Sequence, residues 1–374
     1  MKIIPLKYIG MILLLSIING CTKNTTIKEE AVTENTKLNN RLINMFSKTK
    51  LLCFGRYALE VPAEAKLIIG TQTVEVIKIK SQDLHFKIIE DIKEIFTKDK
   101  TAEITYNNEG PIKNSWQLRY YESIHAKKMK FLFFQTYITK GDFTFIAGDA
   151  VNVDIGEREE EIAGRQLRLA KNIRLRDTEE VPSDPGICVE HGFLAENLYN
   201  EQEMDNVGIY FPSIPDITFS VSSNKDAYGD YPAEEFEKRW RSELSLLNRI
   251  EGAKEIQGES YPKRNLLREG KRKVQHWKGE ESLIRRPDGV HDFEWALVGK
   301  PKNIANPSVL EAKLYSKVAH NRVGAAEAAS LTDEEAIALW DKLLSSLKFR
   351  VKVPGAPPGS YYIDPEKSQP PPAR

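Results

Sequence analysis

The sequence is poor in the residues and motifs that mark most active sites and metal centres. Three cysteines and six histidines are scattered over 374 residues. There is no G-x-S-x-G nucleophile elbow, no phosphate-binding G-x-x-x-x-G-K-[ST], no dinucleotide-binding G-x-G-x-x-G and no H-E-x-x-H zinc motif. We therefore expect no catalytic residues, no cofactor, no metal and no small-molecule substrate.

The chain also lacks a net charge. Lys and Arg together number 54, as do Asp and Glu. A nucleic-acid-binding domain usually carries a basic excess, so no nucleic-acid partner is expected. Local charged patches on a partner-binding face remain compatible with this balance. A content of 41% hydrophobic and 29% charged residues is typical of a globular protein with a packed core.

The N-terminus carries an apolar run, residues 9–18, preceded by Lys2 and Lys7. The run is short for a membrane span and has the layout of a secretory signal. The sequence Ile18-Asn19-Gly20-Cys21 resembles a bacterial lipobox. This resemblance implies cleavage before Cys21, diacylation of its thiol and a firm membrane anchor. Thr22 follows in place of Asp, which implies the periplasmic face of the outer membrane. The alternative is a plain signal peptide with an incidental cysteine.

Two cysteines, Cys53 and Cys188, remain in the body of the chain. Each lies in a segment expected to open a domain as a strand. The simpler interpretation is a pair of buried free thiols, although an oxidising compartment would permit a disulfide between them. The sequence leaves both possibilities open.

A repeated segment suggests how the chain is organised. Residues 160–176 and 334–350 align without a gap, and each begins with Glu-Glu. Each ends in an apolar residue, a base, an apolar residue and Arg. We interpret both as the closing helix and short strand of a domain. A period of this length indicates a duplicated domain and not a solenoid.

Each half is expected to run β, β, α, several β, α, β, so strands and helices do not alternate strictly. We therefore expect an α+β fold of two similar domains, each a largely antiparallel sheet with two helices, arising from internal duplication. The expected parts are a signal peptide (1–20), a tether (21–47), an N-terminal domain (48–176), a linker (177–186), a C-terminal domain (187–352) and a Pro-rich, poorly ordered tail (353–374).

Several local patterns support these elements. Ser81 is expected to cap a helix with an apolar stripe at Leu84, Ile88, Ile92 and Ile95. Thr332 and Glu335 predict a capping box. The expected strands are 51–62, 73–80, 102–106, 115–121, 129–138, 143–147, 187–193, 216–222, 254–259, 271–284, 291–298 and 309–318.

Exposed aromatic and charged residues mark two candidate partner-binding loops. Tyr228 and Tyr231 lie in a loop rich in Gly and Asp, and Arg285 and Arg286 precede a turn at Asp288. Tyr and Arg are enriched at protein–protein hot spots. The alternative is an ordinary loop and hairpin with solvated charges.

An enzymatic alternative rests on His291, Asp292 and Glu294. The two carboxylates are two positions apart in an expected strand and would share a face. They could then act as acid and base. A solvated sheet face explains the same pattern more simply.

Several short stretches resemble one known family. They are Cys53-Phe54-Gly55-Arg56-Tyr57 with Val61-Pro62, Gly186-Ile187-Cys188 with Gly192-Phe193, and Phe211-Pro212-Ser213-Ile214-Pro215-Asp216 with Ile217-Thr218-Phe219-Ser220. They are similar to immunity proteins against type VI secretion lipase effectors, in the branch that opposes the fourth lipase class. The resemblance implies a periplasmic, non-catalytic inhibitor that binds a secreted phospholipase and blocks substrate access. The alternatives are an envelope hydrolase of unfamiliar type and a structural envelope lipoprotein.

Overall fold

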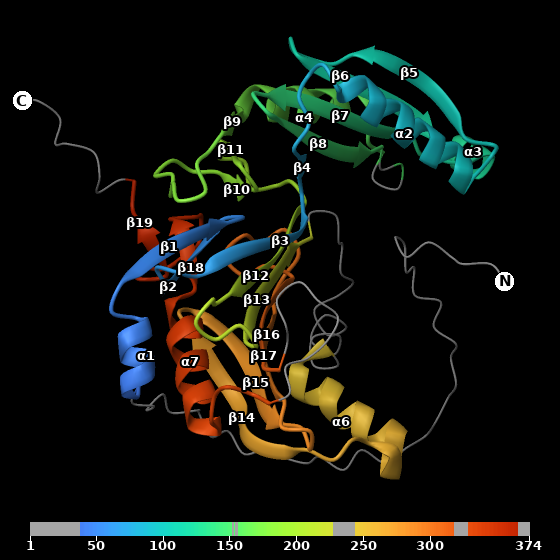
Figure 1. The fold of residues 1–374 in the computed structure, drawn as a ribbon. Helices are drawn as coiled ribbons and strands as arrows, with labels where there is room; N and C mark the ends of the chain where they lie inside the picture. Colours follow the sequence, from blue (N-terminus) through green and yellow to red (C-terminus); the bar gives the residue numbers. More distant parts are fainter. Residues whose placement is uncertain (1–37, 152, 154–155, 227–243, 318–327, 366–374) are drawn as a thin grey trace, which may run out of the picture. The chain divides into compact units, whose positions relative to one another are not determined.

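Two sheets with the same internal strand order make up most of the fold. The computed structural model describes residues 38–151, 153, 156–226, 244–317 and 328–365. The first half of the chain forms a sheet in the order β4-β8-β7-β6-β5, and the second half contains β13-β17-β16-β15-β14 (Figure 1). If β4 is matched with β13 and β5 to β8 with β14 to β17, the two orders are identical. This confirms the expected α+β fold of two similar, largely antiparallel domains.

The bounds of these strands follow the sequence patterns closely in several places. In the first sheet they are β4 (Glu75–Ile77), β5 (Glu103–Glu109), β6 (Ser115–Tyr121), β7 (Phe133–Lys140) and β8 (Phe143–Ala150). In the second they are β13 (Thr218–Lys225), β14 (Asn265–Val274), β15 (Trp277–Arg285), β16 (His291–Val298) and β17 (Val309–Tyr315).

Two long helices accompany each sheet, as expected. The first half has α2 (Leu84–Lys98) and α4 (Glu159–Asn172), and the second has α6 (Leu246–Gln257) and α7 (Asp333–Ser346). A short 3-10 helix, η2 (Gly258–Ser260), directly follows α6. Short helices α1 (Asn40–Met45) and α3 (Ile124–Lys128) complete the described set. The predicted capping box is present at α7, where the Glu335 carboxylate accepts the Thr332 N–H at 2.9 Å. None of the helices in the described part of the chain has the length and apolar character needed to cross a bilayer.

The two halves exchange their closing strands. Strand β18 (Lys348–Val351), which closes the second half, pairs with β2 (Tyr57–Pro62) in the opening hairpin of the first half. Strand β9 (Ile173–Leu175), which closes the first half, pairs with β11 (Gly192–Leu194) in the opening hairpin of the second. The hairpins are completed by β1 (Thr49–Phe54) and β10 (Ile187–Val189). The repeated segments found in the sequence therefore occupy equivalent places in a reciprocal arrangement.

A disulfide joins the two opening hairpins. Cys53 of β1 and Cys188 of β10 are bonded, with their Cα atoms 5.9 Å apart. The backbones of Gly55 and Cys188 also exchange two hydrogen bonds of 2.8 Å. The expectation of two free thiols is therefore wrong, because the exchange of strands brings the hairpins side by side. Both cysteines are buried, as the sequence predicted.

One sheet contains strands from both sides of the linker. Strand β3 (Lys66–Gln72) comes from the first half but pairs with β12 (Glu203–Tyr210) at the edge of the second sheet, extending it to seven strands. The linker itself is held by two arginines from equivalent positions in the repeat. Arg176 donates to backbone carbonyls of Asp177 and Glu180, and Arg350 donates to those of Pro182, Asp184 and Gly186. Residues 177–186 are thus fixed to the protein by buried guanidinium groups.

The hydrophobic core is largest in the second half. Trp277, Trp295 and Trp340 are fully buried there and lie in one cluster with residues of β1, β2, β12 and β13. Beside it, Arg268 and Arg272 bind the carboxylates of Glu281 and Asp341. A buried ion cluster of this kind is stable only when each charge keeps its partner.

Several expected elements differ from the structure. Residues 51–62, 187–193 and 271–284 were each expected as one strand but form hairpins, whose turns use left-handed backbone at Gly55, His191 and Gln275. Residues 254–257 are the end of helix α6 and residues 258–259 lie in η2, so this segment is not a strand. Asp83, and not Ser81, precedes α2 at its N-cap. Of the strand expected at 73–80 only β4 at residues 75–77 forms, and the strand expected at 129–138 begins later, as β7 at Phe133, after the turn that follows α3.

The C-terminal tail is also more ordered than expected. Strand β19 (Tyr361–Ile363) pairs in parallel with β18. Val353, Ala356 and Ser360 are buried. The prolines between them limit the conformations of the segment, but its apolar side chains have a core to cover. The expectation of a poorly ordered tail is therefore wrong for residues 354–365.

Candidate functional site

The predicted partner-binding turn between β15 and β16 is exposed and firmly held. The Arg286 N–H donates to the Val290 carbonyl at 2.8 Å, and the Val290 N–H donates to Asp288 Oδ1 at 3.2 Å. Gly289 adopts left-handed backbone with φ of +85°, which a Pro-Asp-Gly turn favours. The side chains of Arg285 and Arg286 are 41% and 49% exposed.

Ion pairs fix both arginines of this turn. Arg286 Nε donates to Asp292 Oδ2 at 3.0 Å, and Arg285 lies 3.1 Å from Asp333 in the first turn of α7. Lys317 Nζ donates to the Asp288 carbonyl at 2.6 Å. The structure thus brings together three of the predicted binding residues, Arg285, Arg286 and Asp288, on a preorganised surface. The other two, Tyr228 and Tyr231, and the lipidation candidate Cys21 lie outside the described residues.

The residues of the enzymatic alternative do not form an active site. His291 is 1% exposed, and its Nε2 lies 2.8 Å from Asp333 Oδ1, so it is a buried structural residue. Asp292 and Glu294 do share a face of β16, but Asp292 is held by Arg286 and Glu294 lies near Arg249 and Lys313. The solvated-face interpretation therefore explains both carboxylates. Within the described ranges, no group of three His, Cys, Asp or Glu residues could hold a metal ion.

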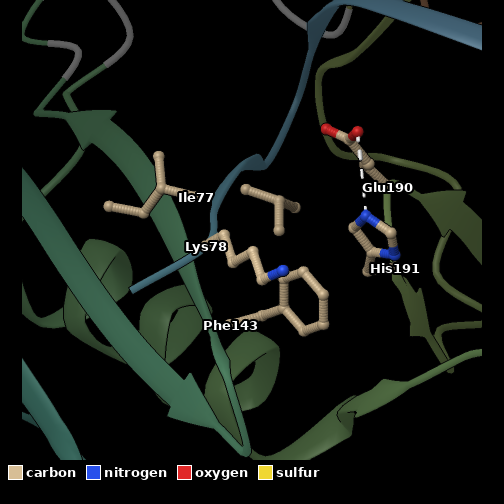
Figure 2. A pocket seen from close by; sticks show the side chains of 6 residues that line it. Ile77, Lys78, Phe143, Glu190 and His191 are labelled. Carbon is tan, nitrogen blue, oxygen red and sulfur yellow. Dashed lines mark ion pairs between the residues drawn. The ribbon is translucent and has the colours of Figure 1, made fainter. Parts of the chain in front are cut away.

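A small hollow lies where β4 meets the β10–β11 turn. It measures about 190 Å³ and is lined by Val76, Ile77, Lys78, Phe143, Glu190 and His191. Figure 2 shows that His191 lies beside Phe143 and is joined to Glu190 by a dashed line. The ring centroids of His191 and Phe143 are 4.2 Å apart, and His191 Nε2 lies 3.9 Å from Glu190 Oε1. Pockets that hold drug-sized ligands measure about 300–1,000 Å³. The hollow is therefore too small to take a phospholipid as a substrate.

Sequence reasoning missed a buried charged cluster under the disulfide-linked hairpins. Arg56 binds the Glu203 carboxylate through Nε at 2.7 Å and Nη2 at 3.0 Å, and Lys225 Nζ lies 3.2 Å from Glu203. Asp205 lies directly below Gly55, where an added Cβ would come within 2.0 Å of its Oδ2. These residues are far apart in sequence, and only the alternation of Glu203 and Asp205 in β12 could have indicated a shared buried face.

Burial sets the ionisation of this cluster. Burial, reinforced by the charge of Glu203, raises the pKa of Asp205 to about 7, while the Gln72 amide and the Arg56 charge oppose the shift. Gln72 Nε2 donates to Asp205 Oδ1 at 3.2 Å, and Gln72 Oε1 accepts the Glu190 N–H at 3.1 Å. The cluster therefore joins β3, β12 and the second hairpin at the junction of the halves.

Comparison with known proteins places the chain in a family. The N-terminal domain of Tle cognate immunity protein 4 matches residues 50–177, and the C-terminal domain matches residues 180–352. No curated protein matches the chain significantly.

Solved structures agree with the family match. The apo immunity protein TplEi of the T6SS from Pseudomonas aeruginosa is 25% identical with a TM-score of 0.59, over 81% of this chain and 97% of that chain. TplEi with an "L" peptide is 24% identical with a TM-score of 0.57, over 81% and 98%. A Tle4–Tli4 complex contains a chain 25% identical with a TM-score of 0.61, over 81% and 98%. With both family domains matched in order along one chain, this protein belongs to the Tle cognate immunity protein 4 family.

Proposed function

We propose that this protein binds a phospholipase effector delivered by type VI secretion and inhibits it by covering the active-site mouth or by holding the lid. The observation that carries the proposal is the match of both family domains across nearly the whole described chain. A relative of the same fold was solved as the Tle4–Tli4 complex. The family consists of immunity proteins and not enzymes, so inhibition requires shape and anchoring contacts only.

The junction of the halves suits such an inhibitor. The Cys53–Cys188 bond, the exchanged strands and the fixed linker hold the two sheets together before any partner arrives. A preorganised binder loses less conformational entropy on association. An interface of about 1,600–2,000 Å² would suffice for a specific complex.

The turn of Arg285, Arg286 and Asp288 is the described surface that we assign to partner contact, together with Tyr228 and Tyr231. Its arginines are half-exposed and already oriented by Asp292 and Asp333. Binding therefore does not have to immobilise them, which favours hot-spot behaviour.

Inhibition can be tested by titrating the polypeptide from residue 22 into a candidate effector and following phospholipid hydrolysis. We expect activity to fall to zero at one-to-one stoichiometry. The double variant Arg285→Ala/Arg286→Ala should weaken inhibition about thirtyfold or more, because truncated hot spots typically cost at least about 2 kcal/mol. Arg249→Ala is the matched control, since Arg249 is equally exposed and also ion-paired on the second sheet.

The outcomes separate the alternatives. Loss of inhibition in the arginine variant alone supports the assigned surface. Equal inhibition by all three proteins would move the contact elsewhere. Absence of inhibition and of co-elution with any related lipase would refute the immunity proposal and favour a structural envelope lipoprotein.

We further propose that the protein acts in the periplasm, anchored through lipid on Cys21 to the inner leaflet of the outer membrane. The buried Cys53–Cys188 disulfide supports an oxidising compartment, because such bonds are rare in reducing cytosol. Mass spectrometry of the mature protein should find a diacylated N-terminal cysteine, and Cys21→Ser should abolish the lipid and the salt-resistant association with the outer membrane. Recovery of wild-type protein without lipid in the soluble periplasmic fraction would contradict the anchor.

A further inference from the structure

Helix α3 exposes its apolar side chains instead of burying them. None of its residues is buried, and Ile124 and Met129 at its two ends are 50% and 51% exposed. Both ends of the helix are fixed by local structure. Ser123 caps its start by accepting the Ala126 N–H at 3.1 Å, and Lys130 follows its end in left-handed backbone with φ of +57°. A short helix in a globular domain normally directs such residues to the core. The exposure of both side chains therefore points to a partner.

The end of helix α2 lies beside α3. The Ile124 N–H donates to Thr101 Oγ1 at 2.9 Å, and Lys127 pairs with Glu103 at the start of β5. Figure 1 shows α3 next to the turn that connects α2 to β5. Phe96, in the last turn of α2, is also 40% exposed. We refer to residues 93–101 and 122–130 as the α2–α3 tip.

The α2–α3 tip carries more positive than negative charge in a chain that is neutral overall. Lys98 pairs with Glu94, and Lys127 pairs with Glu103. Four further lysines of the tip have no carboxylate partner among the described residues: Lys93, Lys100, Lys128 and Lys130. Two carboxylates of the tip, Asp99 and Glu122, have no lysine partner among these residues. Asp99 accepts hydrogen bonds from Thr101 instead.

We propose that the α2–α3 tip docks on the surface of an anionic phospholipid membrane, with Phe96, Ile124 and Met129 inserted among the headgroups. Apolar side chains within a lysine-rich surface are the combination that binds the interface of anionic bilayers. A protein partner is less well suited, because protein interfaces are enriched in Tyr, Trp and Arg and depleted in Lys. The tip contains four lysines that pair with no carboxylate in the described part of the chain, and it contains no Tyr, Trp or Arg.

Two other exposed apolar residues provide the contrast. Ile256 at the end of α6 and Leu266 at the start of β14 are 88% and 58% exposed. Residues 251–266 contain equal numbers of basic and acidic residues: Lys254, Lys263 and Arg264 against Glu251, Glu255 and Glu259. Each of these two side chains is therefore more exposed than Phe96, Ile124 or Met129, but the excess of positive charge is missing.

The docking surface goes beyond effector inhibition and can be tested without an effector. The polypeptide from residue 22, which lacks lipid but contains every described residue, is sedimented with vesicles of phosphatidylethanolamine and phosphatidylglycerol and with vesicles of phosphatidylcholine alone. We expect binding to the anionic vesicles that weakens with salt. Lys128→Gln/Lys130→Gln should lower the partition coefficient roughly 25-fold, since each lysine near an anionic surface contributes about fivefold.

Two further variants distinguish lipid docking from other causes. Ile124→Ser/Met129→Ser should also lower binding, whereas the matched control Ile256→Ser/Leu266→Ser should leave it unchanged. All variants should keep the wild-type melting temperature, because every substituted side chain is exposed. Equal binding by wild type and tip variants would overturn the proposal. The proposal also fails if no vesicle binds and the tip variants instead lose effector inhibition, which would assign the tip to the protein partner.

Discussion

Removing the Cys53–Cys188 bond should destabilise the protein substantially. The two cysteines are separated by 135 residues and both are buried at the junction of the halves. The bond closes a long loop in the unfolded chain, so its loss restores conformational entropy to the unfolded state. For a loop of this length the chain-entropy relation gives about 5 kcal/mol at 25 °C.

The same free-energy loss predicts the change in melting temperature. Unfolding entropy near 60 °C is about 2.1 cal/mol/K per residue, or roughly 600 cal/mol/K for a domain of about 300 residues. A loss of about 5 kcal/mol then lowers the melting temperature by about 8 °C. We expect this shift for Cys53→Ala/Cys188→Ala, measured by circular dichroism against the oxidised wild type.

A reduced wild-type sample separates the bond from the side chains. Wild type unfolded and refolded in a strong reductant should melt within about 2 °C of the double variant, because both lack the same constraint and the deleted sulfur atoms contribute little. A shift below about 2 °C in both samples would refute the reasoning. It would mean that the exchanged strands keep the halves associated even in the denatured ensemble.

Three further substitutions test the junction and the core. Asp205 has a pKa of about 7 in the folded protein and about 4 when unfolded, so the free energy of unfolding should fall as pH rises between these values. Asp205→Asn should flatten that decline, and in denaturant titrations at pH 8 its free energy of unfolding should be higher than that of wild type. Glu281→Gln should cost about 3–5 kcal/mol, because it leaves buried guanidinium charge uncompensated, whereas exposed Arg249→Ala should cost under about 1 kcal/mol. Gly55→Ala should prevent stable folding, seen as loss of the cooperative melt, because its Cβ would overlap Asp205 Oδ2.

Local patterns predicted the elements whose determinants are close in sequence. The α2 stripe was right at Leu84, Ile88 and Ile95, which are buried, and the Thr332 capping box fixed the start of α7. Strands β6 and β16 match the expected bounds, and along most of their length residues alternate between a buried and a more exposed face. The repeated segment was informative because the same helix–strand unit closes both halves.

Long-range pairing was not visible in the sequence. Strands β3 and β12 were missed, since each is stabilised by the other across the linker. The disulfide remained open for the same reason: Cys53 and Cys188 meet only because the hairpins exchange partners. Left-handed turns at His191 and Gln275 were hidden because neither residue is glycine. Of the candidate contact residues, the sequence suggested Arg285 and Arg286 but not the ion pairs that orient them.

The exchange of closing strands has a consequence for how the protein is made. The hairpin of β1 and β2 receives its third strand, β18, only when Lys348 pairs with Ala58. During synthesis the first half therefore emerges with that hairpin edge open, and nearly the whole chain must follow before the edge is covered. Contacts of such high sequence separation form slowly, because the intervening chain must first be closed into a loop. An open edge that persists this long is a pairing site for other chains, so folding yield should depend on keeping the unfinished chain apart from its copies.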